Sequence, residues 1–277
     1  MRSTLAELLL RVPLFVLVLA FIRPTPPPRP APAPPDAMPL TLALAPTPAA
    51  PACAEGMVLV DGDYCDEVDE TCIKERPKPH LGCLEYAAPT VCEGKQTHMR
   101  FCMDKYEFPN IEGEKPMVMA SWYDADKACR ALSKRVCRSH EWTLACEGPD
   151  HLPYPYGYVR DSKACHIDER GPMIDEKKFY SVDQDKEIAR VDRREPSGAR
   201  PGCGSPFGVF DLTGNVDEWT TNETGVPDHG TLKGGNWGEW RNACRPHTNG
   251  HAAWFRYYQL GFRCCTDAPE PRGSPEP

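Results

Sequence analysis

Fourteen cysteines constrain this chain more than any other feature of its sequence. Zinc sites usually bring their thiolates in Cys-x-x-Cys pairs, and the sequence contains no such pair. The gaps are long instead, as between Cys65, Cys72, Cys83, Cys92 and Cys102. An even count with this spacing predicts mostly disulfides, formed in an oxidising compartment. The alternative is a cytosolic protein with many buried thiols, and the N-terminus argues against it.

The first 23 residues have the layout of an export signal or N-terminal anchor. Arg2 and Arg11 supply positive charge before the apolar run of residues 12–22, which is shorter than the ~20 residues that a membrane span needs. An uncleaved anchor remains the alternative if residues 8–10 extend the run. The sequence therefore predicts export to the periplasm, the cell surface or the medium, with membrane contact only through this segment.

Composition divides the rest of the chain. Residues 24–52 are dominated by Pro and Ala, which predicts an extended linker, and residues 268–277 are expected to form a disordered tail. Residues 53–267 form one predicted domain, with residues 61–100 as a cysteine-rich insertion. The formal charge is −8 with Lys and Arg scattered among the acids, so no basic stripe indicates a nucleic-acid partner.

Two capped helices and several short strands are expected in this domain. Ser121 followed by Asp124 is a capping-box pattern, and Ser139 is the expected cap of a second, shorter helix that stops at Gly148. The chain from Gly157 to about Pro206 is expected to be mostly loop. The expected strands cover residues 57–60, 101–108, 207–210, 232–237 and 260–265. Few helices, short strands and stapled loops together predict a compact α+β domain.

Seven short motifs follow one another in a fixed order between Gly56 and Cys265. They are Gly56-Met57-Val58-Leu59-Val60, Asp104-Lys105-Tyr106-Glu107-Phe108-Pro109-Asn110, Ala120-Ser121-Trp122-Tyr123-Asp124-Ala125, Lys134-Arg135-Val136-Cys137-Arg138-Ser139-His140-Glu141-Trp142, Tyr154-Pro155-Tyr156-Gly157, Gly208-Val209-Phe210-Asp211-Leu212-Thr213-Gly214-Asn215-Val216-Asp217-Glu218-Trp219, and a closing pair, Lys233-Gly234-Gly235-Asn236-Trp237 with Gly261-Phe262-Arg263-Cys264. In this register the chain resembles the formylglycine-generating-enzyme (sulfatase-modifying factor) family.

The resemblance implies a C-type-lectin-like fold in a single domain with little regular structure. In such domains the first helix is stapled to the last strand. Cys129 lies on the apolar stripe of the first expected helix, and Cys264 and Cys265 lie on the last expected strand. Because neighbours on a strand point to opposite faces, one of these two is expected to reach Cys129 while the other pairs elsewhere.

The family's chemistry depends on two cysteines, five residues apart, that follow the Gly-Gly step and bind copper(I) and the substrate thiol. The matching positions here are Glu239 and Cys244. Because a carboxylate is a hard ligand and copper(I) prefers soft thiolates, copper is not expected. Cys244 has two interpretations, a residual catalytic nucleophile or half of a disulfide, and the even cysteine count favours the disulfide.

The resemblance also implies a calcium site in the loop that begins at Asp211. Its ligands would be the side chains of Asp211 and Glu218 and the carbonyl groups of Gly214 and Val216, and calcium prefers such oxygen ligands. The alternative is a tight turn in which Asp211 and Asn215 satisfy the backbone. The two carboxylates at the family spacing favour calcium.

Three functions stay open at this stage. The first is a binding or structural module whose groove, with Asn236, Trp237 and Arg245 as expected lining residues, holds a peptide or a glycan. The second is a formylglycine-generating oxidase acting on a sulfatase cysteine, and the third is another oxygen-dependent oxidoreductase of the family. The missing thiol pair favours the first. Most of the aromatic side chains between Trp237 and Tyr258 are expected to be core.

Overall fold

The computed structural model describes residues 51–78, 82–222 and 230–270. The predicted export signal and nearly all of the predicted linker lie outside these residues. Within the described ranges, none of the helices combines the length and the apolar character needed to cross a bilayer.

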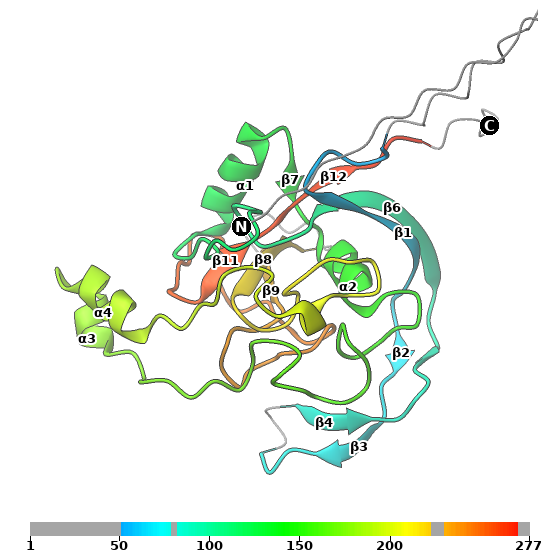
Figure 1. Cartoon of the computed structure of the whole chain (residues 1–277), viewed down its shortest axis with the longest axis horizontal. Helices are drawn as coiled ribbons and strands as arrows, with labels where there is room; N and C mark the ends of the chain where they lie inside the picture. The colour runs from blue at the N-terminus through cyan, green and yellow to red at the C-terminus, as the bar shows by residue number, and fades with distance from the viewer. Residues whose placement is uncertain (1–50, 79–81, 223–229, 271–277) are drawn as a thin grey trace, which may run out of the picture. The chain divides into compact units, whose positions relative to one another are not determined.

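Two four-stranded sheets organise the domain (Figure 1). The first sheet has the order β1-β6-β12-β7, with β1 (Met57–Cys65), β6 (Gln96–Asp104), β12 (Cys264–Asp267) and β7 (Arg135–Val136). The second has the order β10-β9-β8-β11, with β10 (His247–Thr248), β9 (Gly230–Lys233), β8 (Asp217–Thr221) and β11 (Leu260–Phe262). Two small sheets pair β2 (Val68–Asp69) with β5 (Val91–Cys92) and β3 (Cys72–Glu75) with β4 (Cys83–Tyr86).

The helices are short, and the two predicted ones are present. Helix α1 (Trp122–Ala131) begins at Ser121, whose side chain forms the expected capping box with Asp124. Helix α2 (Ser139–Glu147) begins one residue earlier than predicted, because Arg138 is its cap and Ser139 is already helical; Gly148 ends it at φ +65°. Helix α2 contacts β1 and β6 of one sheet and β8 and β9 of the other, so it is buried on most sides.

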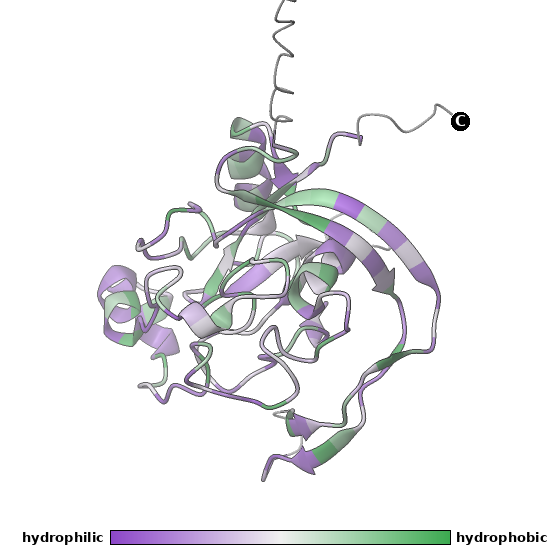
Figure 2. Ribbon diagram, turned by 45° about the vertical axis from the view of Figure 1, so that its right-hand side comes forward, coloured by the Kyte–Doolittle hydropathy of each residue, from purple (hydrophilic) through white to green (hydrophobic). Residues whose placement is uncertain are grey.

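The expected insertion is less irregular than its composition suggested. Strand β1 continues from Val60 to Cys65, and β6 already begins at Gln96, so the outer parts of this segment extend the first sheet in antiparallel register from Met57↔Asp104 to Cys65↔Gln96. Hydrophobic and hydrophilic residues are interspersed along this curved strand pair (Figure 2). The middle of the segment forms the two small sheets, and β4 is held to the rest of the domain by hydrogen bonds between residues 84–86 and 158–160.

Three other expectations differ from the structure. The presumed loop after Gly157 contains α3 (Glu176–Phe179) and α4 (Gln184–Val191), which dock through Phe179 and Val191 onto Trp237. Residues 207–210 form only a single bridge, between Gly204 and Phe210, and the last expected strand is broken into β11 and β12 at Arg263. The few helices, short strands and stapled loops confirm the predicted α+β class.

Arg263 lies where the chain leaves one sheet and enters the other. It is fully buried, and Nε and Nη2 donate to the two carboxylate oxygens of Glu218 on β8, each at 2.7 Å. Its remaining donors reach the carbonyl oxygens of Asp104 and Phe210 at 3.3 and 3.0 Å. Trp142 of α2 donates to Glu218 as well, at 2.9 Å. The ion pair therefore connects both sheets with α2, and its donors are satisfied as burial requires.

All fourteen cysteines form disulfides, which confirms the interpretation of the cysteine count. The seven bridges are Cys53–Cys102, Cys65–Cys92, Cys72–Cys83, Cys129–Cys264, Cys137–Cys265, Cys146–Cys244 and Cys165–Cys203. Cys264 thus reaches α1, and Cys265, which points to the opposite face of β12, reaches the end of β7.

The two bridges from β12 close nearly the same loop, which predicts non-additive effects of removing them. With one bridge intact, the other closes only a short ring, so Cys129→Ala/Cys264→Ala and Cys137→Ala/Cys265→Ala should each lower the free energy of unfolding by about 2.5 kcal/mol. Removing both bridges should cost about 6 kcal/mol, more than the sum of the two, because the larger loop then opens. Urea unfolding of the three variants measures this, and an additive result would contradict the shared-loop explanation.

Candidate functional site

A tight Gly-Gly turn positions the loop that carries the expected active positions. Gly234 and Gly235 follow β9 with φ values of +86° and +67°, a region that favours glycine. A Cβ atom on Gly234 would lie 2.4 Å from the Leu212 carbonyl oxygen, and one on Gly235 would lie 2.1 Å from the Trp240 carbonyl oxygen. The turn therefore packs directly against the backbone of Trp240 and fixes where this residue stands.

Trp240 stands between two adjoining hollows of about 420 and 920 Å³. Both hollows are lined by Asn236, Trp240, Tyr257 and Gln259, so together they form one elongated groove, here called the Trp240 groove. The smaller hollow is also walled by Phe255, on which the His251 ring stacks at 4.0 Å. Its floor is closed by the ion pair between Asp217 and Arg241.

The larger hollow brings together segments that are far apart in sequence. It is lined by residues 76–78 from the cysteine-rich segment, residues 169–174 and the loop after the Gly-Gly turn. Trp237 lies beneath it, only 3% exposed, and its ring is tilted against Tyr258 at 5.8 Å. The groove therefore combines aromatic walls with the carboxamides of Asn236 and Gln259.

The two positions at which the family has its thiol pair, 239 and 244, make other interactions in this protein. Cys244 is fully buried and bridged to Cys146, so the disulfide interpretation describes it and it has no thiol to serve as a nucleophile. Glu239 lies in the larger hollow, 3.4 Å from Arg76 and 4.0 Å from Arg170. A carboxylate held between two guanidinium groups, with no free cysteine in the chain, does not fit copper(I).

One predicted groove residue lies elsewhere. Asn236 and Trp237 line the Trp240 groove, but Arg245 lines a separate pocket and pairs with the buried carboxylate of Glu147 at 2.8 Å. The reason is that the chain turns back through Cys244 to pair β10 with β9, which moves Arg245 away from the groove. The prediction for Arg245 was therefore wrong.

Local sequence patterns hardly indicate which of the aromatic residues between Trp237 and Tyr258 are exposed. Trp240 is 54% exposed and Trp254 is 72% exposed, whereas Trp237 is buried. The charged neighbours of Trp240, Glu239 and Arg241, are the one local signal that pointed to a surface position. Gln259, which lines both hollows, has no such signal.

In the loop from Asp211 to Glu218, the side chains expected to bind calcium bind other groups of the protein instead. Both carboxylate oxygens of Glu218 bind Arg263, while one oxygen of Asp211 accepts a hydrogen bond from the Gly198 amide at 2.7 Å. No group of three or more His, Cys, Asp or Glu side chains among the described residues is arranged to hold a metal ion. The donor set as arranged does not fit calcium, and calcium binding here stays a prediction.

Three buried carboxylates and one guanidinium group form a cluster beneath this loop. Glu107 accepts hydrogen bonds from Ser197 and Asn215 at 3.1 and 2.9 Å. Burial, together with the nearby charge of Asp211, raises the pKa of Glu107 well above its ordinary value. Burial also raises the pKa of Asp211 to about 6, and the charge of Glu218 adds to the effect. Arg263 compensates only one of the three negative charges, so the native state favours protonation of the other two.

This cluster predicts that stability falls as the pH rises. A carboxyl group with a raised native pKa binds more protons in the native state than in the unfolded state, so its contribution is fully present below pH ~4 and is lost as pH rises through the native pKa. For Asp211 that window extends to about pH 6 and corresponds to a loss on the order of 2–3 kcal/mol.

The Glu107→Gln variant should lose part of this dependence, because its amide mimics the protonated carboxyl. Denaturant unfolding between about pH 4 and 8, with a chelator present, should give a shallower decline for the variant than for the parent protein. Glu112→Gln, which changes an exposed carboxylate, is the control. Equal slopes for Glu107→Gln and the parent protein would contradict the assignment.

Similarity to known proteins agrees with the fold and with the altered thiol site. The protein is 29% identical over 172 residues to inactive C-alpha-formylglycine-generating enzyme 2 of Bos taurus, covering 58% of this chain and 53% of that protein. It is 26% identical over 160 residues to the formylglycine-generating enzyme of Mus musculus, covering 56% of this chain and 40% of the enzyme. The chain thus spans about half the length, or less, of these relatives.

The crystal structure of CarF shares the fold, with a TM-score of 0.52 and 16% identity over 77% of this chain and 98% of that one. The model of the sulfatase-modifying factor enzyme 1-like domain matches residues 82–268, more than half of the chain. These residues include six of the seven motifs and the whole lining of the Trp240 groove except residues 76–78. The chain therefore belongs to the sulfatase-modifying factor enzyme 1-like domain family.

Proposed function

We propose that the protein is an exported, disulfide-stapled binding module whose Trp240 groove holds an extended peptide, and that it does not oxidise cysteine to formylglycine. The observation that carries this proposal is the bridge between Cys146 and Cys244, which leaves an open groove without a thiol. Glu239, at the position of the other thiol, is held by Arg76 and Arg170. The protein thus has an open groove, but neither of the two thiols expected beside it is available.

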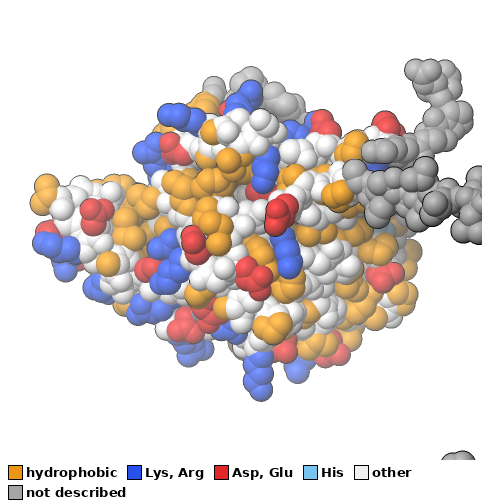
Figure 3. Space-filling view, turned by 45° about the horizontal axis from the view of Figure 1, so that its top comes forward, with side chains coloured by type: hydrophobic (Ala, Val, Ile, Leu, Met, Phe, Trp, Pro, Cys, Tyr) orange, Lys and Arg blue, Asp and Glu red, His pale blue; other side chains and the backbone are white. Residues whose placement is uncertain are grey.

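The shape and lining of the groove favour a peptide. Two hollows in a row can take successive side chains of an extended chain, and the aromatic rings of Trp240, Tyr257 and Phe255 offer apolar contacts. The carboxamides of Asn236 and Gln259 can donate to and accept from a peptide backbone. Charges of both signs line the groove, so it does not select for a highly charged ligand. Acidic and basic side chains are also interspersed on the face of the molecule that Figure 3 shows.

Export is supported by the same covalent framework. Seven disulfides form and persist in an oxidising compartment and are rare where thiols are kept reduced. The apolar N-terminal run of the sequence points to the same compartment.

The absence of a reactive thiol is the first expected outcome. The protein, denatured without reductant, should show no reactive thiol, and peptide mapping should recover Cys146 linked to Cys244. A copper-supplemented oxidation assay with a cysteine-containing sulfatase peptide should then give no formylglycine. A free Cys244, or formylglycine formation, would favour the oxidase function instead.

Peptide binding at the groove is the second expected outcome. A random peptide library displayed on phage should yield binders, and Trp240→Ala should weaken them roughly 30-fold, as expected for an aromatic residue central to an interface. Trp254→Ala removes a second exposed tryptophan that lines neither hollow and is the matched control. A library that yields no binders, or equal losses in both variants, would overturn the peptide assignment.

A further inference from the structure

A second pocket, of about 360 Å³, lies on the other face of the sheet that borders the Trp240 groove. Side chains alternate between the two faces of a strand, and β9 shows the consequence. Thr231 and Lys233 line this pocket, whereas Leu232 between them lines the groove. The pocket is therefore independent of the function proposed for the groove.

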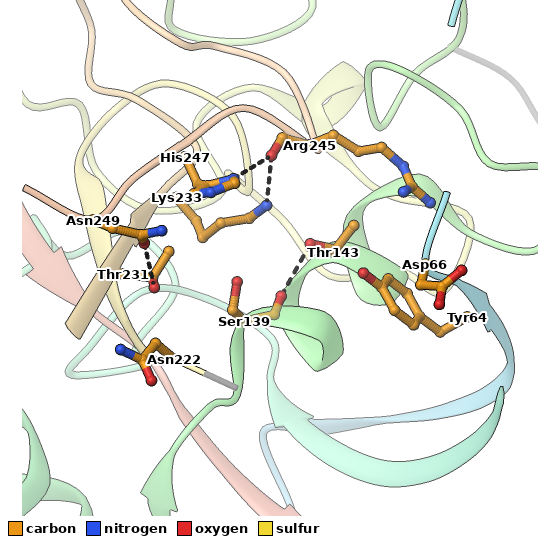
Figure 4. A pocket seen from close by; sticks show the side chains of 10 residues that line it. All are labelled: Tyr64, Asp66, Ser139, Thr143, Asn222, Thr231, Lys233, Arg245, His247 and Asn249. Carbon is orange, nitrogen blue, oxygen red and sulfur yellow. Dashed lines mark hydrogen bonds between the residues drawn. The ribbon is translucent and has the colours of Figure 1, made fainter. Parts of the chain in front are cut away.

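The lining of this pocket differs in kind from the groove. Every one of its ten lining side chains carries a hydrogen-bonding group, and they come from β1, α2, β8, β9 and β10 or the residues next to them (Figure 4). Hydroxyl and amide groups converge from opposite sides, with α2 across from β9 and the residues that follow β10. Its volume is that of a small-molecule site.

Several of these side chains are held in place by protein contacts. The Lys233 side chain is buried, and Nζ donates to the Arg245 carbonyl oxygen at 3.0 Å and lies 5.3 Å from the centre of the Trp142 ring. The guanidinium of Arg245 is fixed by two hydrogen bonds of 2.8 Å to Glu147. Thr231 donates to the Asn249 side-chain oxygen at 2.8 Å. Because these side chains are already ordered, ligand binding does not incur the conformational-entropy cost of ordering them.

Some side chains that line the pocket can still form hydrogen bonds to a ligand. Within the described part of the chain, the Ser139 hydroxyl and the Asn249 amide nitrogen make no hydrogen bond to protein, and both line the pocket. Thr231 keeps acceptor capacity after donating to Asn249. The pocket therefore presents donors and acceptors side by side.

The charge balance argues against a simple anion. Arg245 is neutralised by Glu147, and Asp66 at the pocket places a carboxylate opposite the charge of Lys233. A ligand that fits must both donate and accept at several points, and it must not depend on net charge. The hydroxyl groups of a sugar ring do this, because each can donate one hydrogen bond and accept others.

We propose that this pocket binds a single sugar ring of a saccharide. The ring hydroxyls accept from Asn249 and Ser139 and donate to Thr231 and Asp66. Because the pocket is open and polar, one ring is bound weakly, and affinity comes from the sum of a few hydrogen bonds.

The test uses the full-length protein with its disulfides intact and a panel of methyl glycosides of glucose, galactose and N-acetylglucosamine, with glucuronate, inorganic phosphate and glycerol as comparison ligands. Saturation-transfer NMR detects binding, and titration gives the dissociation constant. At least one glycoside should bind with millimolar affinity, and Ser139→Ala and Asn249→Ala should each weaken it about fivefold, the effect of one lost hydrogen bond.

Trp240→Ala, on the other face of the sheet, is the matched control and should leave the saccharide affinity unchanged. The same two pocket variants should leave peptide binding at the groove unchanged, so the two proposals fail separately. Unaltered thermal midpoints show that the variants are folded. The proposal is overturned if no glycoside binds, if phosphate or glycerol binds as well as the sugars, or if saccharide binding survives both pocket variants.

Discussion

The buried ion pair between Arg263 and Glu218 is the interaction on which the rest of the structure depends. Both side chains are essentially fully buried, and their attraction repays the desolvation only because the geometry is bidentate and the other donors are satisfied. The pair sits at the residue where the last strand changes sheets, between β11 and β12. With Trp142 of α2 bound to the same carboxylate, one charge pair sets the relative position of two sheets and a helix.

The disulfides reinforce this junction from both sides. Cys264 and Cys265 follow Arg263 directly and, because they point to opposite faces of β12, they tie it to α1 and to the end of β7. A third bridge, from Cys146 on α2 to Cys244, anchors the loop that follows the Gly-Gly turn. Cys244 therefore contributes to the covalent framework of the loop that borders the Trp240 groove.

The second sheet separates two surfaces with different chemistry. Alternation along β9 places Leu232 on the side of aromatic residues and carboxamides, and Thr231 and Lys233 in a pocket whose lining side chains all carry hydrogen-bonding groups. A peptide groove and a saccharide pocket on opposite faces of one short strand would let a single module hold two ligands at once. The carboxylate cluster around Glu107 lies beneath the adjoining loop and couples the stability of this framework to pH.

The sequence by itself determined the family, the α+β class, the disulfide state of most cysteines and the start of α1, because these depend on local signals: motif order, cysteine spacing and a capping box. It also showed that Glu239 replaces a thiol. Only the tertiary structure decided which partner each buried charge takes. Glu218 matches a calcium ligand in sequence, yet Arg263, 45 residues away, claims both its oxygens. Arg245 follows the groove loop in sequence, yet strand pairing turns it to the other face. Such outcomes depend on long-range register, which no local pattern of residues encodes.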